Sequence, residues 1–95
     1  MCKPGYSIKT YVQVDVEFHD NGVMHPKGIL WEDGQYYEID RVLDIRSAPA
    51  AKAGGRGDRY TVRLGRQTTY LFFEHNTDCS SSVLGRWFVE RRHVQ

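Results

Sequence analysis

Few residues of this sequence have the type and spacing of a chemical site. His75 and Cys79 are four residues apart, and with His25 or Asp78 they are the best candidates for zinc ligands. A zinc site requires three or four ligands, and no second ligand pair with suitable spacing accompanies them. We therefore expect no bound metal and no cofactor.

Catalytic groups are equally sparse. Cys79 and His75 have the chemistry of a thiol nucleophile and its base, but single Cys and His residues in a Ser-rich segment are usually just solvated. Asp40 and Asp44 are paired acids on a segment that we expect to be a strand with surface carboxylates. The sequence contains no phosphate-binding loop and no nucleotide fingerprint. We expect a protein that is not an enzyme.

The elements that carry these residues read as strands. Apolar and polar residues alternate from Val12 to Phe18, and the turn-forming Asp20-Asn21-Gly22 follows. Side chains alternate between the two sides of a strand, so this run predicts a half-buried strand. The side chains expected to face the core are Val12, Val14, Val16 and Phe18.

A first hairpin is predicted around Asp33-Gly34, because this dipeptide is a strong signal for a two-residue type I′ turn. Such a turn pairs Trp31 with Tyr36 and Leu30 with Tyr37. The expected faces are Leu30, Tyr37 and Ile39 on one side and Trp31 and Tyr36 on the other.

The stretch from Tyr37 to Arg46 fits two structures. Its apolar residues fit one face of a strand, with Arg41 as an interruption, and a subset of them fits a helix. The preceding hairpin and the β-branched residues favour the strand, and no capping residue stands just before Tyr36.

The residues from His25 to Gly28 break the alternating pattern, and two further segments predict loops: 47–58 and His75 to Ser82. The segment 47–58 is rich in Ala, Gly and Pro, which predicts a flexible loop. It contains Arg56-Gly57-Asp58. An integrin-binding role for this triplet would require an extracellular protein, which nothing else in the sequence indicates.

A second hairpin is predicted with a type II′ turn at Gly65-Arg66. This turn pairs Leu64 with Gln67 and continues to Arg59 opposite Phe72. The side chains expected to face inward are Tyr60, Val62, Leu64, Leu71 and Phe73. The opposite face then collects Arg59, Thr61, Arg63, Thr68, Tyr70 and Phe72, a mixture of arginine and aromatic residues that a solvent-exposed strand does not require.

The last strand, Arg86 to Glu90, is apolar on both sides at its centre, which predicts a central or closing strand. About six strands in so short a chain predict an all-β fold. We expect a small, strongly curved antiparallel sheet that closes into an SH3-like or OB-like barrel, because closure protects the strand edges.

Length and composition bound the remaining expectations. The 95 residues, 40% of them hydrophobic, predict one domain over 1–95. No apolar stretch is long enough to span a membrane, and Cys2 and Cys79 form no CxxC pair, so we expect a cytoplasmic protein with reduced thiols. Residues 1–47 carry five Lys or Arg against eight Asp or Glu, whereas residues 48–95 carry eight against four.

The order of hydrophobic and turn positions resembles a group of small uncharacterised bacterial β-domains over about two-thirds of the chain. The resemblance implies the fold. Some members of that group are encoded near DNA-repair polymerases, which implies work on nucleic acid, but no site residue can be transferred. The loop with Arg56-Gly57-Asp58 departs from the group in length and composition. The positions that carry the resemblance are Pro26, Ile29 to Trp31, Gly34, Tyr37 to Ile39, Arg41 to Asp44, Arg59 to Val62, Tyr70 to Phe72 and Gly85 to Val89.

Two functions fit these features. The first is a protein-interaction or homodimerisation module, since interfaces are enriched in aromatic residues and arginine. The alternative is a nucleic-acid-binding barrel in which Tyr70 and Phe72 stack on bases and arginines, Arg56 among them, contact phosphates. A pI of 7.8 is low for a dedicated nucleic-acid-binding domain. The candidate interaction residues are Trp31, Tyr36, Arg59, Arg63, Arg66, Tyr70 and Phe72.

Overall fold

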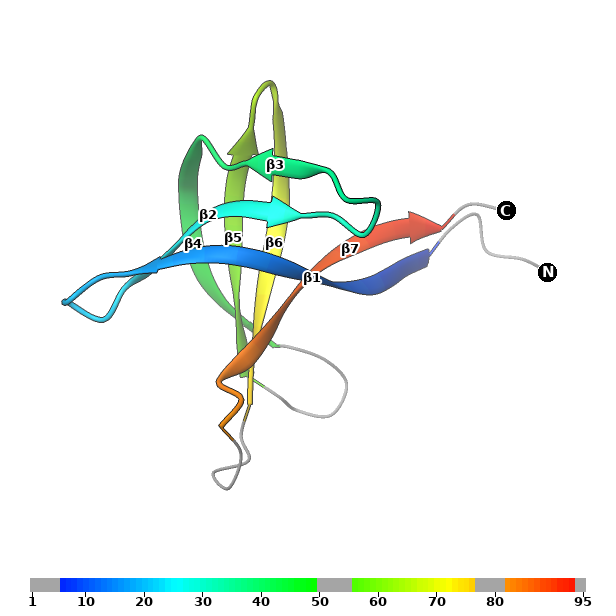
Figure 1. Ribbon diagram of the computed structural model, residues 1–95. Coiled ribbons are helices and arrows are strands. Elements are labelled where there is room, and N and C mark those ends of the chain that lie inside the picture. The colour runs from blue at the N-terminus through cyan, green and yellow to red at the C-terminus, as the bar shows by residue number, and fades with distance from the viewer. Residues whose placement is uncertain (1–5, 50–55, 77–81, 94–95) are drawn as a thin grey trace.

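The protein is a curled, all-β sheet of seven antiparallel strands (Figure 1). The computed structural model describes residues 6–49, 56–76 and 82–93, and these residues contain no helix. The strands are β1 (Tyr6–Phe18), β2 (Met24–Leu30), β3 (Tyr36–Glu38), β4 (Arg41–Pro49), β5 (Arg56–Leu64), β6 (Gln67–His75) and β7 (Gly85–His93). Their order in the sheet is β3-β2-β1-β7-β6-β5-β4, which confirms the predicted fold class.

Two bent segments curl the sheet into a half-barrel. The first half of β1 pairs with β7 and its second half pairs with β2. The second bend lies between β3 and β4: β3 pairs with β2, whereas β4 pairs with β5 at the opposite end of the sheet. At the bend between β3 and β4, the Ile39 N–H donates to the Lys27 carbonyl (2.9 Å) and the Asp40 N–H donates to the Arg63 carbonyl (2.8 Å). The chain therefore connects the two ends of the sheet.

This bend accounts for the number of strands. The stretch from Tyr37 to Arg46 is extended, as predicted, and is not a helix. Ile39 and Asp40 divide it into two strands, each with a different neighbour, so the sheet has seven strands rather than about six.

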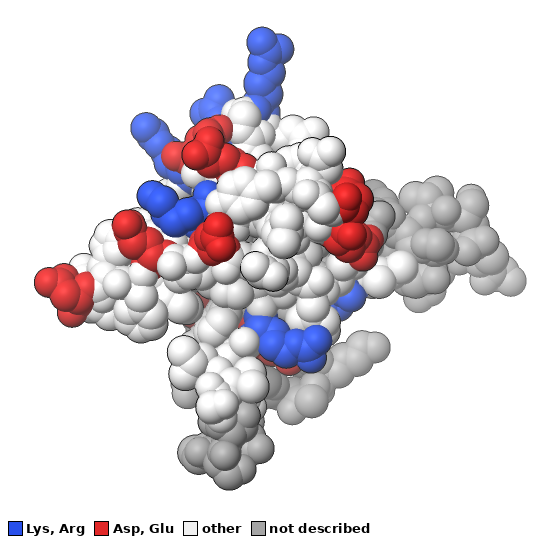
Figure 2. All heavy atoms as spheres, viewed as in Figure 1, with Lys and Arg blue, Asp and Glu red and all other residues white. Residues whose placement is uncertain are grey.

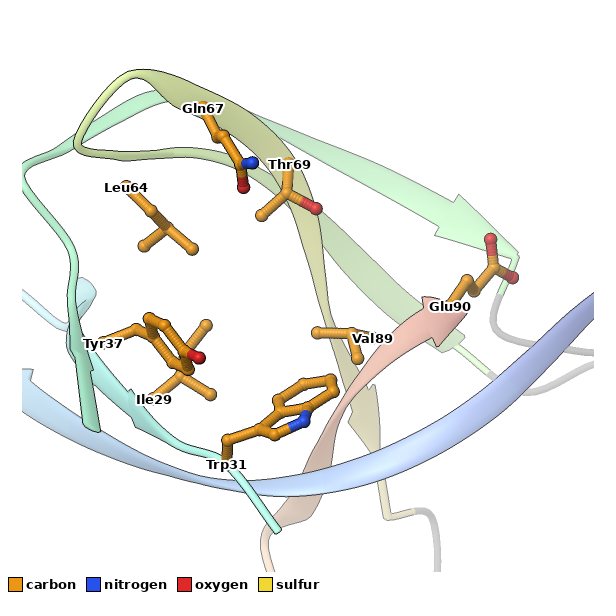
Figure 3. Close-up of a pocket in the computed structure, with 8 residues that line it drawn as sticks. All are labelled: Ile29, Trp31, Tyr37, Leu64, Gln67, Thr69, Val89 and Glu90. Carbon is orange, nitrogen blue, oxygen red and sulfur yellow. The ribbon is translucent and has the colours of Figure 1, made fainter. Parts of the chain in front are cut away.

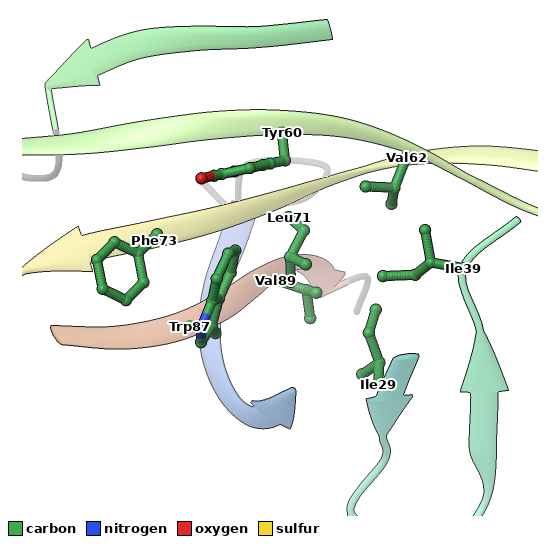
Figure 4. Close-up of a cluster of buried hydrophobic side chains, with 8 residues drawn as sticks. All are labelled: Ile29, Ile39, Tyr60, Val62, Leu71, Phe73, Trp87 and Val89. Carbon is green, nitrogen blue, oxygen red and sulfur yellow. The ribbon is translucent and has the colours of Figure 1, made fainter. Parts of the chain in front are cut away.

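The hydrophobic core lies inside the curl (Figure 4). Val62 and Leu71 are fully buried at its centre. The hairpin of β5 and β6 has the predicted register from Leu64↔Gln67 to Arg59↔Phe72. Gly65 has a φ of +62°, as the first central position of a type II′ turn requires. The remaining buried side chains of the cluster are Ile29, Ile39, Tyr60, Phe73, Trp87 and Val89.

Strand β7 occupies the centre of the sheet, between β1 and β6, in agreement with its prediction as a central strand. Trp87, Phe88 and Val89 are all buried, although they alternate between the two faces. Trp87 and Val89 belong to the core cluster, while Phe88 lies on the outer face between the rings of Phe72 and Tyr11.

The prediction for β1 is correct at three positions and wrong at the fourth. Val12, Val14 and Val16 pack against the core. Phe18 has the same parity, but 63% of it is exposed. The hairpin of β1 and β2 projects beyond the rest of the barrel, so its end has no opposing layer to cover Phe18 (Figure 1).

The predicted register of the β2–β3 hairpin is wrong by one residue. Leu30, not Trp31, is opposite Tyr36. The Gly34 N–H donates to the Trp31 carbonyl (2.9 Å) and Gly34 has a φ of +89°, which defines a three-residue connection rather than a two-residue type I′ turn. The shift places Trp31 and Tyr36 on opposite faces and leaves Leu30 outside, so Ile29 fills the core instead.

Two segments that lack alternation belong wholly or partly to strands. Residues 25–28 lie within β2, where a bulge at Lys27 causes the break in alternation: Asp15 is opposite Gly28 and Val16 is opposite Pro26. The ends of the predicted loop 47–58 belong to β4 and β5, and its middle, 50–55, lies outside the described residues. The Arg-Gly-Asp triplet therefore begins strand β5.

Candidate interaction surfaces

The predicted interaction residues do not form one surface. Arg59, Tyr70 and Phe72 lie together on the outer face of β5 and β6, as predicted. Trp31 faces the interior with Tyr37 and Ile29 around a hollow. The remaining three residues are Arg63 and Arg66, near the β5–β6 turn, and Tyr36, on the outer face of β3.

Tyr36 is occupied by contacts within the protein. Its hydroxyl donates a hydrogen bond to Asp15 Oδ2 (3.0 Å), which raises the pKa of the phenol above its ordinary value. A Cβ atom at Gly28 would collide with the hydroxyl and ring of Tyr36. The ring therefore lies across Gly28 and links β3 to β1 over β2.

The outer face of the large sheet carries an aromatic row. The strand registers place Tyr11, Phe88, Phe72, Arg59 and Arg46 side by side across five strands, and we call these residues the outer row. Phe72 and Phe88 stack with centroids 5.0 Å apart and planes at 6°. Tyr11 meets Phe88 edge-on at 5.8 Å. This stacking explains why Phe88 is buried although it points away from the core.

Cations of the same face already cover the rings. Arg86 Cζ lies 3.4 Å from the centroid of Tyr11, and Arg59 Cζ lies 4.6 Å from the centroid of Tyr70. Lys9 Nζ is 4.6 Å from the centroid of Phe88. These cation-π contacts stabilise the folded face. A base that stacked on Tyr11 or Tyr70 from the same side would have to displace an arginine.

Lys9 also joins the outer row to Glu74. Lys9 Nζ and the Tyr11 hydroxyl each donate to Glu74 Oε1 at 3.0 Å. The hydrogen bond from Lys9 is the main reason that the pKa of Glu74 is lowered, and the same bond raises the pKa of Lys9. The pair is about one-third exposed, which limits its contribution to stability.

The outer face of β4 and β5 brings arginines together. Arg41 is directly opposite Arg63, and Arg46 is directly opposite Arg59. Like charges at opposing positions of adjacent strands destabilise a sheet. The charge of Arg46 is balanced by an ion pair with Asp44 (2.7 Å), whereas the Nε atom of Arg59 is buried without a hydrogen-bond partner.

Strands β6 and β7 separate at one end, so the side of β6 that faces β7 has no partner strand from Gln67 to Leu71, while its other side pairs with β5. Their ladder runs from His75↔Gly85 to Phe72↔Phe88 and stops there. The two-residue turn makes Leu64 and Gln67 a hydrogen-bonded pair, so alternate residues of β6 bond to β5. Thr68 and Tyr70 therefore direct their backbone N–H and C=O groups toward β7, beyond the end of the ladder.

A hollow of about 580 Å³ lies beneath this opening (Figure 3). Its walls come from β2, β3, the end of β5, β6 and β7, and most of the lining is apolar or aromatic. In the close-up, the side chains of Trp31 and Tyr37 stand on one side, facing Thr69 and Val89 on the other. The remaining lining residues are Ile29, Leu64, Gln67 and Glu90.

The charge asymmetry of the sequence appears on the surface. Lys and Arg gather at the tip of the β5–β6 hairpin, whereas Asp and Glu lie at the end of the β1–β2 hairpin and over the β2–β3 turn (Figure 2). The hollow lies between the β5–β6 hairpin and the β2–β3 hairpin, and Glu90 is the charged residue in its lining.

The candidate residues for metal binding and catalysis make other contacts or lie outside the described residues. His75 Nε2 pairs with Asp58 Oδ2 (2.9 Å), and His25 stacks on His19 in another part of the barrel. Asp40 Oδ2 accepts the Gly65 N–H (2.6 Å). The positions Cys2, Asp78 and Cys79 lie outside the described residues. Within the described ranges, no three His, Cys, Asp or Glu side chains are grouped to hold a metal.

Sequence reasoning missed the hollow. Trp31, Tyr37 and Leu64 do share an inward face, but that signal depends on the correct β2–β3 register. The part of the chain that the structure describes has no apolar helix of the length that a bilayer requires. Comparison of the chain with protein-family models, with curated proteins and with solved structures found no match.

Proposed function

We propose that the protein is a non-enzymatic interaction module that binds an extended segment of a partner protein in the opening between β6 and β7. The observation that carries this proposal is that the side of β6 left open beyond the end of the β6–β7 ladder lies next to a mostly apolar hollow. A single strand laid along β6 would use both.

The recognition mode is strand addition. A partner strand would exchange backbone hydrogen bonds with Thr68 and Tyr70, whose N–H and C=O groups face the opening. Every second side chain of that strand would point into the hollow, toward Trp31 and Tyr37. The lining favours aliphatic or aromatic side chains at those positions, since most of the lining residues are apolar or aromatic.

A proline substitution tests this mode without damage to the barrel. Thr68→Pro removes an N–H that faces the opening and is not used in the ladder to β5. Thr68→Ala is the matched control, because it removes the same exposed side chain and keeps the N–H. Thr69→Arg places a long charged side chain in the hollow, because Thr69 is one of its lining residues.

The probe is a phage-displayed library of random peptides about ten residues long, a length typical of strands. Enriched peptides are resynthesised and measured by fluorescence anisotropy. We expect a period-2 apolar pattern, a loss of affinity of at least about tenfold with Thr68→Pro and with Thr69→Arg, and little change with Thr68→Ala. Failure to enrich any peptide, or equal binding by Thr68→Pro, would overturn the proposal.

The arginine pairs favour nucleic-acid binding as a second candidate function. Arg41 opposite Arg63 and Arg46 opposite Arg59 create a repulsion that a phosphate backbone would relieve. Tyr70 lies beside Arg59 and is about half exposed, so part of its ring is open to a base.

The test uses a labelled oligothymidine of about 15 nucleotides at about 50 mM salt. The double variant Arg59→Glu with Arg63→Glu should abolish binding, and Lys27→Glu on β2 should not. Absence of binding by the native protein, or equal binding by the double variant, would exclude this candidate.

The proposed module works in the cytoplasm. The support is the cysteine pattern of the sequence, since Cys2 and Cys79 are far apart and form no CxxC pair. Both thiols should react with a maleimide reagent in protein prepared from intact cells. A disulfide between them would contradict this location.

A further inference from the structure

Strand β4 ends the sheet and has one free side. It pairs with β5 from Arg41 to Pro49, with a bulge at Leu43, and the described residues contain no strand on its other side. A free edge of this length is a template for pairing with another chain. Leu43 and Ile45 are large apolar residues on this strand, and 44% of Ile45 is exposed.

The hydrogen-bond pattern identifies the groups that the free edge offers. Leu64 bonds to β6 at the hairpin turn, so by alternation Thr61 and Arg59 bond to β4. Their partners on β4 are Asp44 and Arg46. The backbone groups of the intervening residues, Ile45 and Ser47, therefore point to the free side.

We propose that two copies of this protein pair through β4, antiparallel and about a two-fold axis at Ile45. In this register Ile45 faces Ile45 of the second copy and exchanges both backbone hydrogen bonds with it. Asp44 lies opposite Arg46 of the second copy, and the symmetry repeats this pair. The two sheets become one continuous sheet, a mode that is independent of the opening between β6 and β7.

The charges of Asp44 and Arg46 favour this register over those with the two-fold axis at either adjacent residue. An axis at Asp44 would place two carboxylates opposite each other, and an axis at Arg46 would place two guanidinium groups opposite each other. Asp44 and Arg46 point to the same face, as their ion pair of 2.7 Å within one chain requires. With the axis at Ile45, Asp44 of each copy can pair with Arg46 of the other copy instead of its own. Pro49, which has no N–H, limits the pairing at its far end.

Charge reversal tests the register directly. In Arg46→Asp, each copy presents acids at both positions, so the pair becomes repulsive. In Asp44→Arg with Arg46→Asp, the charges are exchanged and remain complementary across the axis. Lys27→Asp is the control, because Lys27 is an exposed cation on β2.

The native protein should dimerise in sedimentation equilibrium, with a dissociation constant raised at least about tenfold by Arg46→Asp and restored by the double variant. Ser47→Pro should also give a monomer, since it removes an N–H on the free side only. Circular dichroism verifies that each variant is folded. A monomeric native protein, or a double variant as weak as Arg46→Asp, would overturn the proposal.

The two proposals fail separately. Thr68→Pro should leave the dimer intact, and Ser47→Pro should leave peptide binding intact. Loss of dimerisation in Thr68→Pro would contradict a β4 interface, whereas loss of peptide binding in Ser47→Pro would contradict a site at β6.

Discussion

The ring of Tyr36 occupies the space that a side chain at Gly28 would fill. Tyr36 also reaches Asp15 on the far side of β2 with its hydroxyl (3.0 Å). Tyr36 was predicted to be an interaction residue, but it covers a glycine of the neighbouring strand and links three strands. Glycine at 28 is required by this contact and not by an unusual backbone conformation.

We expect Gly28→Ala to destabilise the protein by about 1–3 kcal/mol, the usual cost of overpacking. In a Tyr36→Ala background the same change should cost less than half as much, because the atoms that collide with the new Cβ are gone. Urea unfolding of the four proteins of this double-mutant cycle measures the coupling. Strictly additive effects would show that Tyr36 does not press on Gly28.

The stacked phenylalanines of the outer row should contribute to stability, although they lie outside the core. Phe88→Ala is expected to cost about 3–5 kcal/mol, since Phe88 is buried between Phe72 and Tyr11. Tyr70→Ala, which truncates a half-exposed ring of the same face, should cost less than about 1 kcal/mol. Thermal unfolding measures the stability lost in each variant. Equal losses would mean that Phe72 and Tyr11 do not shield Phe88 from solvent.

Glu74 makes stability depend on acid pH. Its pKa in the folded protein is lowered, so its contribution is complete above the ordinary value of 4.5 and is lost as the pH falls through the lower folded value. Glu74→Gln should therefore cost up to about 1 kcal/mol at pH 7, and the difference from the native protein should shrink below pH 4.5.

Urea unfolding at several pH values tests this prediction. Glu38→Gln is the matched control, because Glu38 is an exposed carboxylate on β3. A deficit of Glu74→Gln that stays constant through the acid range would show that Lys9 does not hold the charged form of Glu74.

Asp40 should hold the bend between β3 and β4 against the β5–β6 turn. Its carboxylate accepts the Gly65 N–H at 2.6 Å, a charge-assisted hydrogen bond. Asp40→Ala is expected to cost about 1.5–3 kcal/mol, and Asp40→Asn, which keeps an acceptor, less. Amide exchange at Gly65 reports the loss directly, because the N–H should exchange faster in Asp40→Ala. Unchanged exchange would rule out this role.

Turn chemistry decided how much of the fold was predictable from sequence. Gly65-Arg66 forms the expected two-residue turn, so the faces of β5 and β6 and the cluster of Arg59, Tyr70 and Phe72 could be predicted. Asp33-Gly34 fits both a two-residue and a three-residue connection. The choice of the longer connection moved Trp31 from the outer face to the hollow.

The hollow itself had no local signal. It arises because β6 and β7 separate beyond Phe72 while β2 and β3 cross in front of them, and this arrangement depends on the curl of the whole sheet. Strand β1 likewise shows one alternating pattern, although its two halves pair with different strands. Period-2 patterns identify which residues share a face, but not where a sheet bends or opens.

The central place of β7 has a consequence for the growing chain on the ribosome. β7 is the last strand in sequence, and it is inserted between β1, the first, and β6. Until residues 85–93 emerge, β1 and β6 have no common neighbour, and Phe72 lacks the ring of Phe88 against which it stacks. Until β7 is made, the nascent protein therefore presents the open edges of β1 and β6 and an uncovered aromatic face. At this stage we expect it to depend most on chaperones that shield apolar surface.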